Sequence, residues 1–303
     1  MRILLTGPSG FLGSALARYW TEQGHALYLL ARPSSQLDRI DGIRSRVQLL
    51  YTASPEDAIK AVHQVAPDAI VHTACSYGRK GERPLDVLDA NVRFGTALLQ
   101  ATLQRSSSPI RPLVFLNTAT ALESAVSLYA LSKQQFSAWG ATLACQSPES
   151  LKFIDIRLQQ MYGPGDDRSK FTTQIIEACR SNEPRVALTP GAQRRDFIHI
   201  HDVVQAYDRI LKRHQDFATS DAIDVGSGKA ITIREFAEQV KQLARASTHL
   251  DFGVMPYRTH EAMLCVADTA RLTGLGWRAQ ISLSQGLIDM LNDSSRVIRA
   301  SSQ

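Results

Sequence analysis

The feature that most constrains this chain is a glycine-rich turn near its start, between a short apolar segment and one with helical periodicity. Gly7, Gly10 and Gly13 follow the apolar segment Ile3–Thr6 and lead into Phe11–Thr21. Gly7 permits a tight turn, Gly10 lets the backbone approach a ligand, and Gly13 allows the helix to pack closely on the strand. Such a turn at a helix N-terminus is typical of sites that bind a dinucleotide pyrophosphate. The expected contacts are Gly7, Ser9, Gly10, Phe11, Leu12 and Gly13.

Short apolar runs of strand length recur through the first half of the chain and alternate with segments of helical periodicity. Continuous apolar strands separated by helices are typical of a parallel sheet that is covered on both faces. The runs are Ile3–Thr6, Ala26–Ala31, Val47–Leu50, Ala69–His72, Leu113–Asn117 and Lys152–Arg157. We therefore predict an α/β fold with a Rossmann-type doubly wound parallel sheet.

The second half of the chain is patterned more loosely. After Arg157 the strand and helix signals no longer alternate, and Tyr162–Asp166 has turn chemistry. The remaining signals predict helices over Phe171–Arg180, Ile233–Ala246 and Ser284–Asn292, and a strand over Ala222–Val225. We expect a Rossmann dinucleotide-binding domain over residues 1–160, rejoined by 196–226, and a smaller, mainly substrate-binding C-terminal lobe over 161–303.

The composition excludes some classes of function. Lys and Arg number 34 against 29 Asp and Glu, and the net charge of +5 suits a polyanionic ligand as well as an ordinary surface. No stripe of basic and aromatic residues supports nucleic-acid binding, and no apolar stretch is long enough to span a membrane. The four scattered cysteines are typical of a cytoplasmic protein. No metal site is expected at His199, His201 and Asp202, because no further ligand is evident.

The residue after the second predicted strand bears on the choice of dinucleotide. Proteins that select NAD usually place an acidic residue there, where it accepts hydrogen bonds from ribose hydroxyls. In this chain the position is occupied by Arg32. A guanidinium can pair with a 2′-phosphate and stack on adenine, so we expect NADP(H) rather than NAD(H). The alternative is a solvated surface arginine.

A tyrosine and a lysine four residues apart form the candidate catalytic pair. The run Tyr129-Ala130-Leu131-Ser132-Lys133 lies in a predicted helix, where this spacing places both side chains on one face. A nearby ammonium favours phenolate, so we expect Lys133 to lower the pKa of Tyr129. The phenol could then exchange a proton with a carbonyl or hydroxyl while a hydride moves to or from a nicotinamide.

With these motifs the chain resembles the extended short-chain dehydrogenase/reductase family, which includes nucleotide-sugar epimerases, dehydratases and ketoreductases. The resemblance covers nearly the whole length. Further motifs that carry it are His72-Thr73-Ala74, Asn91, Gly95-Thr96, Tyr162-Gly163-Pro164-Gly165, Arg195–Val204, Asp224–Gly228 and Leu275-Gly276-Trp277. The resemblance implies that Tyr129 and Lys133 also contact the cofactor, and that Thr73 and Ala74 lie beside it.

The family also has a Ser or Thr at the end of the fifth strand, which hydrogen-bonds the reacting oxygen of the substrate. The matching run here is Asn117–Thr120, and the resemblance implies this role for Thr118. Thr120 is the alternative, because residues two apart in a strand point to the same side. A third interpretation is that Thr118 only satisfies the backbone at the strand end.

Substrate contacts are implied by resemblance in the second half of the chain. Arg195, from the Arg-Asp-Phe motif, and Arg258 are expected to bind the diphosphate of a nucleotide sugar, for which a guanidinium is well shaped. The family usually has an asparagine before the Tyr-Gly turn, where this chain has Gln160. The longer side chain of Gln160 implies that the diphosphate binds in a different position or that the arginines make more of its contacts.

The resemblance narrows the reaction. Dehydratases of the family carry an Asp-Glu pair directly after the catalytic threonine, where this chain has Ala119 and Thr120, so dehydration lacks an acid and a base. The runs Phe115–Leu122 and Tyr129–Phe136, with a short interval between them, resemble the CDP-abequose and CDP-paratose synthase group. This implies NADPH-dependent reduction of the C4 keto group of a nucleotide-linked 4-keto-6-deoxysugar, with CDP as the favoured nucleotide.

Two other functions stay open at this point. One is a nucleotide-sugar 4-epimerase with tightly bound NAD, and the other is a sensor that binds NADP(H) without catalysis. Joint presence of Thr118, Tyr129 and Lys133 disfavours the sensor. The family also implies a homodimer with a four-helix interface, for which segments 85–103 and 132–144 are the candidates.

Overall fold

The computed structural model describes residues 1–79, 81–104 and 111–293, which form two compact units. The first unit contains Met1–Leu158 and Tyr207–Ile223, and the second contains Gln159–Ala206 and Asp224–Gln303. The segment that returns to the first unit is therefore narrower than the expected 196–226. The reason is that Arg194–His199 is a strand of a sheet in the second unit.

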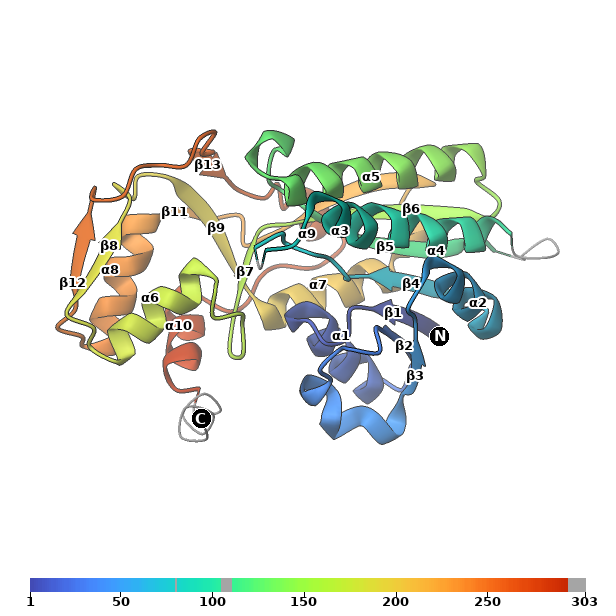
Figure 1. Cartoon of the computed structure of the whole chain (residues 1–303), viewed down its shortest axis with the longest axis horizontal. Helices are drawn as coiled ribbons and strands as arrows, with labels where there is room; N and C mark the ends of the chain where they lie inside the picture. Colours follow the sequence, from blue (N-terminus) through green and yellow to red (C-terminus); the bar gives the residue numbers. More distant parts are fainter. Residues whose placement is uncertain (80, 105–110, 294–303) are drawn as a thin grey trace. The chain divides into compact units, whose positions relative to one another are not determined.

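The first unit is built on a seven-stranded sheet with the order β10-β6-β5-β4-β1-β2-β3 (Figure 1). Its strands are β1 (Arg2–Thr6), β2 (Ala26–Ala31), β3 (Gln48–Tyr51), β4 (Ala69–His72), β5 (Leu113–Thr120), β6 (Leu151–Leu158) and β10 (Ser220–Val225). The pairs from β3 to β6 are parallel. In this order the direction of winding reverses between β1 and β4, which is where sheets of this kind bind ligands.

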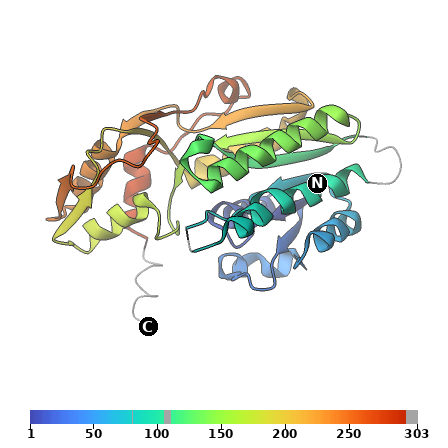
Figure 2. The ribbon, with the colours of Figure 1, turned by 45° about the horizontal axis from the view of Figure 1, so that its top comes forward.

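Helices cover the sheet of the first unit. They are α1 (Phe11–Glu22), α2 (Pro55–Val65), α3 (Pro84–Leu88), α4 (Phe94–Leu103), α5 (Leu128–Gln146) and the second half of α7 (Ile200–Lys212). Figure 2 shows α4 beside α5. Short 3-10 turns lie at Asp38–Arg46, Ser124–Val126 and His214–Asp216, and a π-helical turn, Asp89–Arg93, joins α3 to α4.

Aromatic side chains fill the core between the sheet and α5. Phe115 on β5 stacks on Phe153 of β6 with ring centroids 5.6 Å apart, and Phe136 of α5 packs against both rings. A Cβ at Gly95 of α4 would lie 2.5 Å from the Phe136 ring. The glycine therefore allows α4 and α5 to approach closely, and α5 is fixed against the strand ends.

The second unit has two small sheets and its own core. One sheet has the order β11-β9-β13, with β7 also paired to β9, and the other pairs β8 with β12. The strands are β7 (Gln160–Tyr162), β8 (Arg185–Leu188), β9 (Arg194–His199), β11 (Ala230–Thr232), β12 (His249–Phe252) and β13 (Leu264–Cys265). The helices are α6 (Phe171–Arg180), α8 (Ile233–Ala244), α9 (Ala270–Gly274) and α10 (Leu283–Leu291). Phe197 and Phe236 stack at 4.3 Å in the core.

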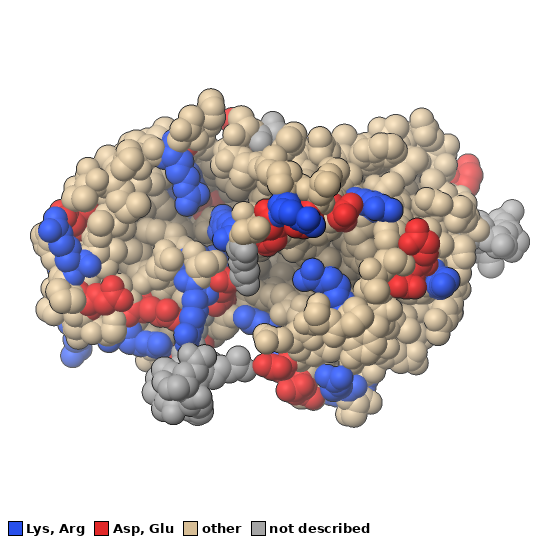
Figure 3. All heavy atoms as spheres, viewed as in Figure 1, with Lys and Arg blue, Asp and Glu red and all other residues tan. Residues whose placement is uncertain are grey.

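Charges of both signs are spread over the surface. On the face drawn in Figure 3, Lys and Arg side chains are interspersed with Asp and Glu and form no continuous basic field. Among the described residues, no helix combines the length and apolar character needed to cross a membrane.

Candidate functional site

The glycine turn has the close backbone packing that a dinucleotide-binding turn requires. Gly7 has a φ of +70°, and a Cβ at Gly13 would lie 2.2 Å from the Gly7 carbonyl oxygen. Gly10 precedes α1 and provides no side-chain cap, so the helix N-terminus stays open to a ligand. Leu12 is buried in the core, which leaves its backbone for a contact. These features fit a pyrophosphate.

A threonine ties the ends of β1 and β4 together beside this turn. Thr6 Oγ1 lies 2.9 Å from His72 Nδ1 and accepts hydrogen bonds from the amides of Thr73 and Ala74 at 3.2 and 3.1 Å. Thr73 Oγ1 in turn donates to the Thr6 carbonyl at 2.7 Å. The expected cofactor neighbours Thr73 and Ala74 thus pack on the glycine turn, since a Cβ at Gly7 would lie 2.9 Å from Ala74 Cα.

Arg32 follows β2 at the same edge of the sheet. The parallel register pairs Thr6 with Leu30, so Arg32 leaves the sheet next to the start of the glycine turn. Its amide donates to Ser35 Oγ at 3.2 Å, and the side chain is exposed. Within the described part of the chain, its guanidinium has no ion-pair partner. An anionic ligand at this edge would find an available cation.

Tyr129 and Lys133 lie in the first two turns of α5, as their spacing predicted. The Ser127 side chain caps the helix by accepting from the Ala130 amide at 3.2 Å. Lys133 is 1% exposed, and no other described residue forms a hydrogen bond or ion pair with its ammonium. A buried cation without a partner is costly unless a ligand supplies one. Lys133 therefore suits a ribose of a bound dinucleotide.

The surroundings of Tyr129 differ from the expectation. Burial raises its pKa well above the ordinary value, Cys75 and Tyr77 add to this, and a hydrogen bond with Thr120 and the charge of Arg79 partly offset it. Lys133 is not among the groups that lower it, so the direction is opposite to the one expected from a neighbouring ammonium. The Tyr77 ring packs against Tyr129, with centroids 4.8 Å apart.

The two candidate threonines of β5 contact different elements. Thr118 Oγ1 accepts a 2.8 Å hydrogen bond from Tyr207 of α7, whereas Thr120 bonds Tyr129 of α5. The two threonines therefore have different partners. Thr120 is the last residue of β5, and its Oγ1 also accepts from the Leu122 amide at 3.2 Å.

Asn91 connects the loop after β4 to α5. It lies in the π-helical turn, is fully buried, and its amide group bonds both the amide and the carbonyl of Ser76. It also donates to Ser132 Oγ at 2.9 Å, and Ser132 donates to the Tyr129 carbonyl. π-helical turns often occur at functional sites. Here the turn orients the segment that carries Tyr129 and Lys133.

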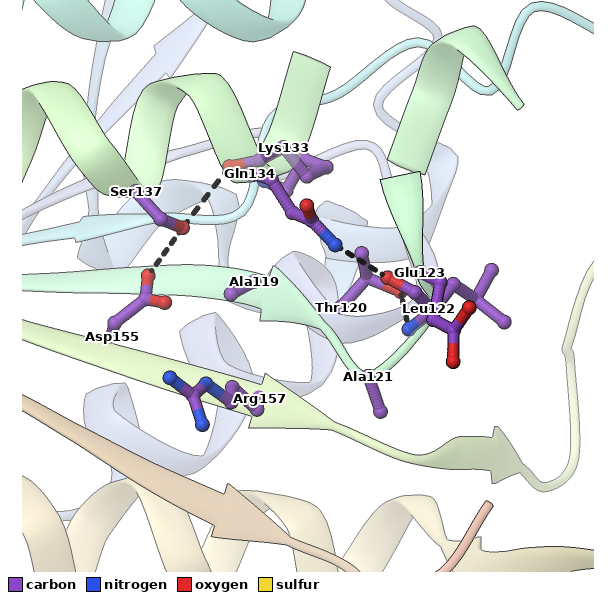
Figure 4. A pocket seen from close by; sticks show the side chains of 10 residues that line it. All are labelled: Ala119, Thr120, Ala121, Leu122, Glu123, Lys133, Gln134, Ser137, Asp155 and Arg157. Atoms are coloured by element: carbon purple, nitrogen blue, oxygen red, sulfur yellow. Dashed lines mark hydrogen bonds between the residues drawn. The ribbon is translucent and has the colours of Figure 1, made fainter. Parts of the chain in front are cut away.

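A pocket of about 370 Å³ lies between α5 and the ends of β5 and β6 (Figure 4). Lys133 and Thr120 line it together with two residues that the sequence analysis did not select, Asp155 and Arg157. Asp155 is a lone acid in the apolar run of β6, and such a residue in a predicted buried strand is itself a signal that could have identified it. Tyr77 and Tyr207 had no comparable signal.

The expected substrate residues lie in the second unit. Arg195 is 12% exposed and forms an ion pair with Glu261, and the Glu261 amide donates to the Arg258 carbonyl at 3.1 Å. Arg258 itself is exposed, and Gln160 begins β7 opposite Phe197 of β9. Arg195 of β9 is thus linked through Glu261 to the loop that contains Arg258. Sequence reasoning missed this carboxylate because it lies 66 residues from Arg195.

Polar side chains of the His199–Asp202 segment bond to nearby backbone amides. The Asp202 carboxylate accepts from the amides of Gln280 and Ile281 at 3.0 and 2.9 Å. His199 is buried, and its Nδ1 lies 3.4 Å from the His201 amide. These contacts fix the start of α7 and the loop before α10.

Comparison with known proteins identifies similar chains. Residues 3–226 match the model of the NAD dependent epimerase/dehydratase family. The CDP-abequose synthase of Salmonella muenchen is 29% identical over 297 residues, which cover 96% of this chain and 97% of that protein.

Solved structures with the same fold include two UDP-glucose 4-epimerases. The one from Thermotoga maritima, with UDP-glucose, has a TM-score of 0.84 at 18% identity and covers 98% of this chain and 100% of that chain. The one from Thermus thermophilus, in complex with NAD, has a TM-score of 0.80 at 22% identity, with coverages of 97% and 98%. At these identities the likeness concerns the fold, and it confirms the predicted Rossmann-type α/β class.

Proposed function

Because the chain belongs to the NAD dependent epimerase/dehydratase family, and is an NAD(P)-dependent oxidoreductase of the extended short-chain dehydrogenase/reductase type, we propose that it is a nucleotide-sugar 4-ketoreductase. It reduces the C4 keto group of a nucleotide-linked 4-keto-6-deoxysugar with NADPH, and CDP is the favoured nucleotide. The observation that carries this proposal is the Thr120–Tyr129–Lys133 group, which handles one proton and contains no acidic pair.

Each residue of the group has a role in the reduction. When bound, NADPH supplies the hydride that C4 receives. Tyr129 donates its proton to the C4 oxygen, and burial suits a donor because it keeps the phenol protonated at neutral pH. The hydroxyl of Thr120, which is bonded to Tyr129, positions the same oxygen, and this role replaces the one expected for Thr118. The Lys133 ammonium holds the ribose of the cofactor and stabilises the charge that develops on the oxygens.

Arg32 supports NADPH over NADH. Its exposed guanidinium lies at the edge of the sheet where the glycine turn begins, and a 2′-phosphate would provide it with a bidentate partner. A reductase that consumes a freely exchanging NADPH fits this arrangement better than an epimerase that retains NAD.

The diphosphate of the substrate is assigned to Arg195 and Arg258, with Gln160 as a neutral contact. Glu261 occupies Arg195 in this structure, so the phosphate and the carboxylate compete for one guanidinium. A guanidinium that is already oriented by a carboxylate loses little side-chain freedom when the phosphate replaces it.

The two other reactions of the family are less well supported. A dehydratase needs acids beside Tyr129, and the positions after Thr118 are Ala119 and Thr120. An epimerase begins by removing a proton from a C4 hydroxyl, which requires phenolate, and burial of Tyr129 opposes the phenolate form.

The direct test is a panel of CDP-, dTDP-, GDP- and UDP-4-keto-6-deoxysugars incubated with NADPH while absorbance is followed. We expect NADPH oxidation with at least the CDP-linked substrate, and one C4 epimer as product. If none of the four oxidises NADPH while ordinary hexose nucleotides interconvert, the protein is an epimerase. If neither occurs although NADPH binds, the protein is a sensor.

We also propose a homodimer, which rests on apolar side chains that the single chain leaves exposed. On α5 these are Leu128, Leu131 and Trp139, at 52, 39 and 53% exposure, and on α3 they are Leu85 and Leu88, at 67 and 42%. Clusters of exposed large apolar residues on helices are typical of protein interfaces.

A further inference from the structure

Two charged groups of the first unit line the pocket without bonding each other. Lys133 comes from α5 and Asp155 from β6, and each has a charged side chain. The two residues are 1% and 8% exposed. Removing either charge from water costs free energy unless an opposite charge is near. Each group is therefore a candidate counter-charge for the other.

The Asp155 carboxylate is held in one orientation. Asn117 Nδ2 donates to Oδ1 at 2.7 Å, and Ser137 Oγ lies 2.9 Å from the same oxygen. The Ser137 hydroxyl also lies 3.0 Å from the Lys133 carbonyl, which ties the carboxylate to the turn of α5 that follows Lys133. The second carboxylate oxygen has no hydrogen-bond partner among the described residues, and Figure 4 shows it directed into the pocket.

The other titratable or charged groups around the pair are His72 and Cys75 near Lys133, Arg157 and Tyr207 near Asp155, and Glu123 on the pocket wall. Burial, and then Lys133, lower the pKa of His72 well below its ordinary value, so this ring is neutral and adds no second positive charge beside the ammonium. Glu123 and Arg157 are exposed, and solvent screens their charges. Burial lowers the pKa of Lys133, whereas Cys75 and Asp155 raise it.

On the basis of the proposed function, in which Lys133 acts as an ammonium, we propose that Asp155 is the positioning residue that keeps Lys133 charged, acting across the pocket between β6 and α5. Asn117 and Ser137 fix the carboxylate for this purpose. Without Asp155, Lys133 would lose its proton at a lower pH. It would then no longer hold the ribose of the cofactor as an ammonium.

The test measures the protonation of Lys133 in the ligand-free protein. Acylation of a lysine requires the neutral amine, so its rate at Lys133, followed by peptide mass spectrometry across a pH series, reports the pKa. We expect the midpoint in Asp155→Asn to fall by about one pH unit relative to the wild type. Asp155→Glu retains the charge and should restore the midpoint. Asp155→Ser, which is smaller and also neutral, carries the same test if the asparagine variant fails to fold.

The matched control is Glu123→Gln, which removes the other carboxylate of the pocket wall. Because Glu123 is exposed, the midpoint of Lys133 acylation in Glu123→Gln should coincide with that in the wild type. Equal midpoints in Asp155→Asn and the wild type would overturn the proposal, and so would an equal shift in Glu123→Gln.

A second readout links the carboxylate to the chemistry. The high-pH limb of kcat/KM for the ketosugar should move to lower pH in Asp155→Asn by the same interval as the acylation midpoint. A shifted acylation midpoint in a protein that reduces no ketosugar would leave this inference standing and refute the proposed function. A protein that reduces the ketosugar but shows no shift of the acylation midpoint in Asp155→Asn would support the proposed function and refute this inference.

Discussion

At the scale of single residues, the proposed preference for NADPH depends on one exposed arginine. Arg32→Asp should lower kcat/KM for NADPH by about 10- to 100-fold, because a hydrogen bond to a charged group contributes roughly 1.5–3 kcal/mol. Its kcat/KM for NADH should stay equal or rise, because a carboxylate can accept from the ribose hydroxyls. Arg44→Asp, an exposed arginine elsewhere in the first unit, is the charge control. Full retention of NADPH preference in Arg32→Asp would refute the assignment.

The hydroxyl that acts beside Tyr129 can be identified by comparing two threonines of one strand. Tyr129→Phe should lower kcat by about 10²- to 10⁴-fold, since it removes the proton donor, with NADPH binding retained. Thr120→Ala should lower kcat more than Thr118→Ala. Thr118→Ala should instead reduce the free energy of unfolding by about 1–3 kcal/mol, because it leaves the Tyr207 phenol without its partner. The opposite ranking in kcat would return the role to Thr118.

Some of this chemistry could be read from the sequence and some could not. The tyrosine–lysine spacing is a property of one helix, so local reasoning placed both residues on α5. The Thr120 contact depends on where β5 ends, and the Glu261 partner of Arg195 comes from a distant loop. The pKa of Tyr129 is raised by burial and, after that, by Cys75 and Tyr77, which only the folded chain brings to the site.

At the scale of elements, the glycine turn and α1 can pack together only because residue 13 has no side chain beyond a hydrogen. Gly13→Ala places a Cβ 2.2 Å from the Gly7 carbonyl and 2.8 Å from Thr73 Oγ1, so the turn must move. We expect at least about a tenfold loss of NADPH affinity and about 1–3 kcal/mol of stability, measured by fluorescence titration and chemical denaturation. Gly42→Ala in the first unit meets no atom of the described residues within 4 Å and should change neither quantity. Unchanged NADPH affinity in Gly13→Ala would refute this account of the turn.

The elements also show which patterns are local. Helix α6 was predicted over Phe171–Arg180 and has these bounds, because its apolar spacing and flanking turns are contained in the segment. The strands β7, β8, β9, β11, β12 and β13 were not predicted. Of these, β7, β11 and β13 have only two or three residues, and each of the six pairs with a segment far away in the sequence. The π-helical turn at Asp89–Arg93 was read as ordinary helix, because one extra residue in a turn leaves the apolar spacing nearly unchanged.

At the scale of the whole molecule, the exposed face of α5 predicts association. Trp139→Glu places a charge on an apolar residue that is 53% exposed. We expect the variant to elute as a monomer in size-exclusion chromatography with light scattering, at concentrations where the wild type is a dimer. Glu149→Lys, a charge change just beyond the end of α5, is the control. A wild type that is monomeric at all concentrations would refute the dimer.

The central claim is that a hydride passes from NADPH to C4 of a nucleotide-linked ketosugar and stays there. NADPH with deuterium on either face of nicotinamide C4 tests this directly, with the product analysed by NMR and mass spectrometry. The account predicts one deuterium at sugar C4 from one of the two labelled cofactors, and one NADP⁺ formed per product. Epimerised product without deuterium and without net NADPH consumption would contradict it.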